Sequence, residues 1–263
     1  MNKISAFFGL KGKSQKDNSL ISKEKIKYMF YRVLGTLFKK SFFTMGEGMS
    51  SNVLARNSYG LFFCRKKSAD LHIISDSYEF DVRILFENLS KKSKIILDIG
   101  ANVGKYSVLA CKVNPYAKVF AFEPSKGNFK ALEINKNINK CKNLFINKVA
   151  LSNKKGKVKL YDGPGSGRYS LKGKSKNFED VEANKLDNLF KNLTIDLIKM
   201  DVEGAELDLL EGSKRLLSKK RIKRMIIEID PENEKRVMRM MHDFGYRIKR
   251  IQYNNFLFYQ KDL

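Results

Sequence analysis

One stretch of this 263-residue chain, residues 94–111, constrains its fold more than any other. It opens with β-branched and other apolar residues, reaches Asp98, turns through Gly100 and Gly104, and continues with apolar residues at helical spacing. The pattern predicts a buried strand, a glycine turn and a helix. Glycines in such a turn let a ligand approach the main chain closely, and the following helix offers N–H groups at its N-terminus. We therefore expect a ligand-binding turn of a parallel α/β sheet.

The next predicted strand, residues 118–123, ends in Glu123. This acid comes about 25 residues after Asp98, near the position where dinucleotide-binding folds hold the diol of a ribose. The third glycine of the dinucleotide pattern is missing, however, and Asp98 would repel a pyrophosphate. Two acids at adjacent strand ends suit a ligand that has an amino acid head and a ribose. The sequence therefore favours S-adenosylmethionine over NAD.

Strand and helix patterns alternate along the rest of the chain, which predicts an α/β fold with a mostly parallel sheet and an antiparallel pair of strands at the C-terminal end. Further strands are predicted at residues 144–151, 157–161, 196–204, 225–230, 246–252 and 256–260. Helices are predicted at residues 82–89, 128–139, 205–217 and 231–243, a loop at 162–176, and a short helix or turn at 183–193. Residues 59–65 and 71–74 are expected to form a β-hairpin ahead of the sheet.

The N-terminal residues 1–55 are predicted to form a basic extension, and residues 56–263 one domain. From Ser22 to Lys40, apolar residues recur every three or four positions among lysines, which predicts an amphipathic helix. Such a helix packs on its own domain or lies on an anionic membrane, and the sequence leaves both alternatives open.

The chain is strongly basic, with 52 Lys+Arg against 28 Asp+Glu and a net charge of +24. This charge favours anionic partners, although a lysine-rich source would have the same effect. Cys64, Cys111 and Cys141 have no metal or redox spacing, which indicates reduced thiols. No apolar run reaches the length of a membrane span or forms the core of a signal peptide. We expect a cytoplasmic protein, peripheral at the membrane if the N-terminal helix docks there.

Acidic residues follow several of the predicted parallel strands, whose carboxyl ends share one edge of the sheet. These acids are expected to converge on one crevice: Asp98, Glu123, Asp201, Glu203, and either Glu228 or Asp230.

Several motifs resemble those of the FkbM-type methyltransferases, over about residues 78–246. They are LDIGANVG at 97–104, FEP at 122–124, VALS at 149–152, LD at 186–187 and IKMDVEGAE at 198–206. The resemblance implies the Rossmann-like, seven-stranded class I methyltransferase fold. It also implies S-adenosylmethionine as the methyl donor and usually O-methylation of a sugar or natural-product hydroxyl.

The resemblance also implies roles for individual residues. Asp98, Gly100, Asn102 and Gly104 would line the methionine part of the donor, Glu123 would hold the ribose hydroxyls, and Ala150 and Leu151 would lie near the adenine. The expected acceptor is a glycan, a glycolipid or a small molecule.

Asp201 is the first candidate for a base that takes the acceptor proton, and Glu203 could raise its basicity by crowding it. Alternatively, the two acids could hold a divalent metal that lowers the pKa of the hydroxyl. In the loop at 162–170, Arg168 could bind an acidic sugar and Tyr169 could stack on a ring. The second hypothesis for function is ribose 2′-O-methylation of RNA, which the net charge favours.

Overall fold

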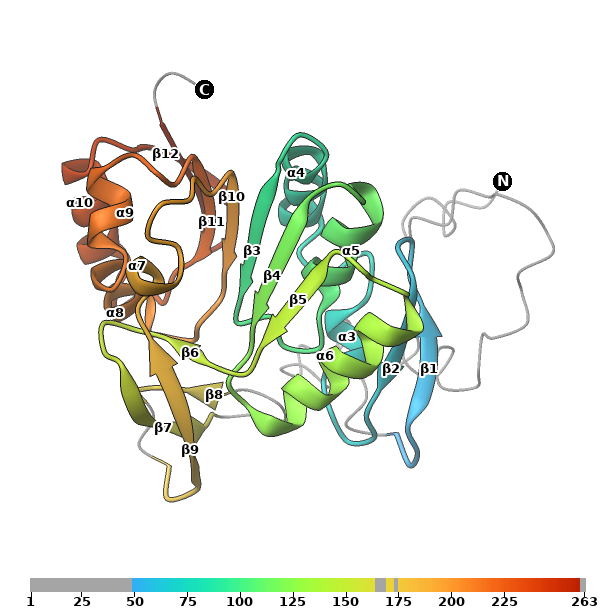
Figure 1. Ribbon diagram of the computed structural model, residues 1–263. Helices are drawn as coiled ribbons and strands as arrows, with labels where there is room; N and C mark the ends of the chain where they lie inside the picture. Colours follow the sequence, from blue (N-terminus) through green and yellow to red (C-terminus); the bar gives the residue numbers. More distant parts are fainter. Residues whose placement is uncertain (1–48, 164–168, 173–174, 261–263) are drawn as a thin grey trace. The chain divides into compact units, whose positions relative to one another are not determined.

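The structure is a computed structural model that describes residues 49–163, 169–172 and 175–260 (Figure 1). It divides into two compact units, Met1–Phe80 and Asp81–Leu263. The amphipathic helix predicted from Ser22 and the candidate acceptor residue Arg168 lie outside the described residues. The predicted boundary between residues 55 and 56 stays a prediction.

The described part of the first unit is a β-hairpin followed by a short helix. Strand β1 (Val53–Arg56) pairs antiparallel with β2 (Leu61–Cys64), and the Asn57 side chain closes the turn by accepting hydrogen bonds from two backbone N–H groups. The predicted partner strand at 71–74 is wrong, because Asp70–Ile73 forms helix α3. The Asp70 carboxylate binds both the backbone N–H and the guanidinium of Arg65, which fixes the start of this helix.

The second unit is built on a seven-stranded sheet in the order β12-β13-β11-β10-β3-β4-β5. Its strands are β3 (Ile95–Ile99), β4 (Lys118–Phe122), β5 (Leu144–Asn147), β10 (Leu197–Met200), β11 (Arg224–Glu228), β12 (Arg247–Gln252) and β13 (Asn255–Tyr259). β13 runs antiparallel to both of its neighbours, whereas β11, β10, β3, β4 and β5 pair in parallel. The predicted mostly parallel sheet with an antiparallel C-terminal hairpin is confirmed.

Helices cover both faces of this sheet. They are α4 (Phe80–Ser90), α5 (Lys105–Val113), α6 (Lys126–Ile138), α7 (Leu186–Leu189), α8 (Glu206–Glu211), α9 (Lys214–Ser218) and α10 (Glu234–Asp243). Figure 1 shows α8, α9 and α10 on one side of the sheet and α4 and α5 on the other. Leucines of α8 and α9, with Val237 and Met241 of α10, pack on buried residues of the central strands and form the main hydrophobic core. No helix of the described residues is long and apolar enough to cross a bilayer.

A second, four-stranded sheet in the order β6-β9-β7-β8 follows β5 in the chain. Its strands are β6 (Ala150–Leu151), β7 (Gly156–Asp162), β8 (Tyr169–Ser170) and β9 (Phe178–Asn184). The single strand predicted at 144–151 is wrong, because residues 148 and 149 separate β5 in the large sheet from β6 in the small one. The loop predicted at 162–176 contains β8, and β9 was not predicted.

The helix predicted at 205–217 is broken between α8 and α9 at Gly212. A Cβ atom at this position would lie 2.1 Å from the carbonyl oxygen of Ser152. Gly212 therefore lets the segment after β6 of the small sheet approach the backbone between α8 and α9.

Candidate active site

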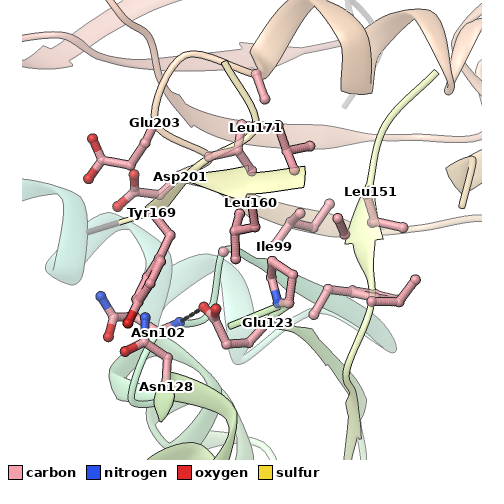
Figure 2. A pocket seen from close by; sticks show the side chains of 17 residues that line it. Ile99, Asn102, Glu123, Asn128, Leu151, Leu160, Tyr169, Leu171, Asp201 and Glu203 are labelled. Carbon is pink, nitrogen blue, oxygen red and sulfur yellow. Dashed lines mark hydrogen bonds between the residues drawn. The ribbon is translucent and has the colours of Figure 1, made fainter. Parts of the chain in front are cut away.

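A cavity opens at the carboxyl ends of β3, β4 and β10 (Figure 2). It has about 630 Å³ of empty volume, part of it open to solvent. The large sheet contributes Ile99, Gly100, Asn102, Phe122, Glu123, Pro124 and Asn128 with the segments that follow β3 and β4, and Asp201, Val202, Glu203 and Ala205 after β10. The small sheet and the residues next to its strands contribute Val149, Ala150, Leu151, Leu160, Tyr169 and Leu171.

Glu123 is a buried carboxylate in the wall of this cavity, with only 4% of its surface exposed. One of its oxygens accepts a hydrogen bond of 2.8 Å from the backbone N–H of Asn102, and the other accepts one of 2.9 Å from the N–H of Ser125. Each carboxylate oxygen has a second lone pair, so Glu123 can also accept hydrogen bonds from ligand hydroxyls.

The glycine turn after β3 is shaped by contacts within the protein. Gly100 has φ +76°, and a Cβ atom there would lie 1.7 Å from the carbonyl oxygen of Asp201. Gly104 has φ +88°, and its Cβ would lie 2.5 Å from the Cδ1 atom of Leu132. Backbone crowding therefore requires glycine at position 100 even without a ligand, whereas glycine at position 104 is favoured mainly by its positive φ. Asn102 also has a positive φ of +50°, which directs its N–H toward Glu123.

Asp98 lies behind the cavity wall and is 2% exposed. Its carboxylate accepts a hydrogen bond of 2.5 Å from the hydroxyl of Ser107 on α5. Burial raises the pKa of Asp98 to about 6, although the Ser107 hydrogen bond and the ammonium group of Lys199 act in the opposite direction. Asp98 therefore joins the end of β3 to α5 beneath the glycine turn.

Asp201 and Glu203 lie across the cavity from Glu123, on the turn between β10 and α8. The Nζ atom of Lys199 is 3.9 Å from the Oδ2 atom of Asp201, and the lysine side chain is 1% exposed. This contact is an ion pair between a buried ammonium group and a carboxylate that lines the cavity. Among the described residues, no group of three or more His, Cys, Asp or Glu side chains could hold a metal ion.

The sequence model of one family, described as the Methyltransferase FkbM domain, matches residues 98–248, which is more than half of the chain. The chain belongs to the FkbM methyltransferase family. It is thus an S-adenosylmethionine-dependent methyltransferase with the Rossmann-like class I fold, and the resemblance seen in the sequence motifs is confirmed. No curated protein matches this chain.

This FkbM methyltransferase can be aligned with solved structures of low sequence identity. An S-adenosylmethionine-dependent methyltransferase from Agrobacterium tumefaciens aligns with a TM-score of 0.49 and 9% identity, over 81% of this chain and 71% of the other. Precorrin-6y C5,15-methyltransferase from Geobacter metallireducens aligns with a TM-score of 0.45 and 13% identity, over 68% and 87%. Ribosomal protein L11 methylase from Lactobacillus delbrueckii subsp. bulgaricus aligns with a TM-score of 0.44 and 15% identity, over 70% and 79%.

Seven of the nine predicted site residues of this FkbM methyltransferase line the one cavity: Gly100, Asn102, Glu123, Ala150, Leu151, Asp201 and Glu203. Asp98 and Gly104 are buried behind its wall, and neither Glu228 nor Asp230 lines it. Glu228 instead accepts a hydrogen bond from the Asn254 side chain.

Asn128 is a cavity residue that sequence reasoning missed. It is 3% exposed and lies on the first turn of α6, five positions beyond Glu123. The sequence signal that could have identified it is a polar residue in the first helical turn after the FEP motif. Leu160 and Leu171 were also missed, because they reach the cavity only through the pairing of the small sheet.

Proposed function

We propose that this FkbM methyltransferase transfers the methyl group of S-adenosylmethionine to a hydroxyl of a sugar, glycan or glycolipid. The observation that carries the proposal is the charge of the cavity. Among the residues that the structure describes, the charged side chains that line it are the acids Glu123, Asp201 and Glu203, whereas the whole chain carries a net charge of +24. Carboxylates suit a cationic donor and an uncharged polyol, and they repel the phosphates of a nucleic acid.

The residues of the cavity fit the donor. Glu123 would accept hydrogen bonds from the ribose hydroxyls, and the apolar side chains of Ala150, Leu151 and Phe122 would pack on the adenine. The main chain at Gly100 and Asn102 would hold the methionine part, with Asp98 and Gly104 supporting this turn from behind. When bound, S-adenosylmethionine supplies a methyl group that is already activated by its sulfonium.

The protein must therefore align the acceptor oxygen and accept its proton. Asp201 is the proposed acceptor of that proton, with Glu203 binding a neighbouring hydroxyl. The Nζ atom of Lys199, 3.9 Å from the Asp201 carboxylate, would help to hold this carboxylate toward the acceptor hydroxyl before it takes the proton. Tyr169, whose side chain extends from the Asp201 side of the cavity toward Asn102 and Asn128 (Figure 2), offers a ring face to a sugar.

Ribose 2′-O-methylation of RNA is the second candidate, and the net charge of +24 is the observation that favours it. The decisive experiment incubates the protein with methyl-labelled donor and separated glycan, lipid and RNA fractions of a cell extract. We expect the label in glycan or glycolipid and none in RNA. Label confined to RNA would overturn the first proposal.

The donor site is tested separately by calorimetry. Glu123→Ala removes the proposed partner of the ribose, so the affinity for S-adenosylmethionine should fall by about 1.5–3 kcal/mol. Glu133→Ala, at an exposed position of α6, is the matched control and should bind the donor like the wild type. An unchanged affinity in Glu123→Ala would contradict the ribose assignment.

Asp201→Asn keeps the size of the side chain and removes its charge. Turnover should fall by about 10²-fold or more while donor affinity changes little. Adding Mg²⁺ or a chelator to the wild type tests the metal alternative, because a metal role predicts loss of activity with the chelator and recovery with the ion. Near-normal turnover in Asp201→Asn would remove this residue from the catalytic assignment.

A further inference from the structure

The turn between β10 and α8 holds its backbone in an unfavourable conformation. Glu203 has φ +47° and Gly204 has φ +92°, so two successive residues are left-handed. Glycine adopts this conformation readily, whereas it is unfavourable for a glutamate. A turn of this kind keeps its shape only if the surrounding structure holds it.

One side of the turn is held by the buried Glu206 of α8 and by Asn233, the residue before α10. The N–H of Gly204 donates a hydrogen bond of 2.8 Å to Glu206, and the Asn233 side chain donates to the Gly204 carbonyl at 3.0 Å and to Glu206 at 2.6 Å. Burial raises the pKa of Glu206, although the hydrogen bonds from Asn233 and Gly204 act in the opposite direction. These contacts fix Gly204 but do not reach the Glu203 carbonyl.

The Glu203 carbonyl is held from the small sheet instead. The hydroxyl of Ser170 on β8 donates a hydrogen bond of 2.7 Å to it. The same hydroxyl oxygen accepts a hydrogen bond of 3.1 Å from the backbone N–H of Lys172, so its own proton is directed toward Glu203. Tyr169, the residue before Ser170, lines the cavity, and one short strand thus contacts both the cavity and the turn.

We propose that Ser170 is a positioning residue, which sets the turn that carries Asp201 and Glu203 relative to the wall that carries Tyr169. The inference rests on the proposed function, because it assigns Asp201 and Glu203 to the acceptor side of the reaction. The Ser170 bond is one of the contacts that keep Asp201 and Glu203 in a fixed geometry relative to an acceptor that contacts Tyr169. Losing this bond loosens the Glu203 side of the turn without altering the donor side at Glu123.

A second contact between the same two segments provides a matched control. The Nζ atom of Lys172 is 3.3 Å from the Asp208 carboxylate, but the two side chains are 45% and 29% exposed. Exposed ion pairs contribute little, so Lys172→Ala should have a small effect. The substitution leaves the backbone N–H of Lys172, and with it the orientation of the Ser170 hydroxyl, in place.

The test compares Ser170→Ala, Ser170→Thr and Lys172→Ala in the full chain, measuring kcat, the acceptor KM, the donor Kd and amide hydrogen exchange at residues 203–205. We expect kcat to fall roughly 3- to 10-fold in Ser170→Ala, the effect of one lost hydrogen bond, with donor Kd unchanged. Ser170→Thr keeps the hydroxyl and should recover most of the rate, and Lys172→Ala should match the wild type. Exchange at residues 203–205 should be faster in Ser170→Ala alone.

Two results would overturn the proposal. Equal losses of kcat in Ser170→Ala and Ser170→Thr would show that packing of β8, and not the hydroxyl, matters. Wild-type exchange at residues 203–205 in Ser170→Ala would show that the bond does not hold the turn. The exchange measurement does not depend on turnover. If the wild type methylates no hydroxyl, the proposed function is contradicted, but the exchange result still shows whether the Ser170 bond holds the turn.

Discussion

Gly100 follows β3 at the point where the neighbouring strand β10 also ends. Its missing Cβ makes room for the carbonyl oxygen of Asp201, and its positive φ adds a second reason for glycine. Gly156 has a positive φ of +120° but nothing within 4 Å of its Cβ position. A comparison of alanine substitutions at these two glycines therefore separates the free-energy cost of crowding, present only at Gly100, from the cost of a positive φ, present at both.

Gly100→Ala should therefore destabilise the protein by at least about 3 kcal/mol, whereas Gly156→Ala should cost about 1 kcal/mol. Urea unfolding of both variants measures the difference, and a failure of Gly100→Ala to accumulate as soluble protein would agree with it. Similar losses in the two variants would mean that the crowding at Asp201 is relieved by a small backbone shift.

Asp98 makes the stability of the protein depend on pH. Its pKa is about 6 in the folded protein against an ordinary value of 3.8, so the folded state binds more protons than the unfolded state between these pH values. The contribution of Asp98 to stability is fully present below pH 3.8 and is lost as the pH rises through about 6.

Asp98→Asn removes this ionisation and keeps an acceptor for Ser107. Relative to the wild type, the variant should gain about 2–3 kcal/mol of stability on going from about pH 4 to pH 8, as measured by urea unfolding at the two pH values. Ser107→Ala removes a hydrogen bond that lowers the pKa of Asp98, and so it should steepen the pH dependence of the wild-type carboxyl. A stability difference between Asp98→Asn and the wild type that does not change with pH would contradict the assignment.

At the scale of elements, segments with strong local signals were predicted well and those that depend on a distant partner were not. β3, β4 and α4 have clear apolar periodicity and lie where the sequence places them. β9 contains three acids and an asparagine in seven residues, which gives little intrinsic strand preference. It is a strand because it pairs with β7, where Lys157 faces Glu182 and Lys159 faces Asp180.

The residues of the candidate site also fall into those that local sequence predicts and those that depend on a distant partner. Residues at the ends of parallel strands could be found from local motifs, because the fold brings all such ends to one edge of the sheet. Asn128 and Leu160 come from a helix face and from the small sheet, and their place at the cavity depends on packing between segments distant in sequence.

Helix α9 has too few residues to be stable by itself. Its first N–H groups are capped by Asp187, a residue of helix α7. The Asp187 carboxylate accepts hydrogen bonds of 2.9 Å from the N–H groups of Arg215 and Leu216. Asp187→Ala should cost about 1–2 kcal/mol in thermal or urea unfolding, and Asp187→Asn, which keeps one acceptor, about half of that. Asp243→Ala, at an exposed position, is the control. A loss no greater than that of the control would mean that water caps α9 equally well.

At the scale of the whole molecule, the exterior and the cavity have opposite electrostatic character. The chain carries a net charge of +24, whereas the charged residues that line the cavity in the described part of the chain are acids. A polyanion is therefore attracted to the protein but disfavoured in the site. Binding of RNA alone cannot identify RNA as the substrate, and the salt dependence of binding must be compared with that of methyl transfer.

We expect RNA to bind at low salt and its affinity to fall steeply, by at least about 10-fold, between about 50 mM and 200 mM salt, because phosphate contacts release counterions. Methyl transfer to a neutral glycan should change no more than about 2- to 3-fold over the same range, since an uncharged acceptor releases few ions. Filter binding and labelled-donor incorporation, run in parallel on the wild type and on Asp201→Asn, measure the two quantities. The variant should bind RNA like the wild type and lose glycan methylation. Label that enters RNA, and that declines with salt in step with RNA binding, would instead establish RNA as the acceptor.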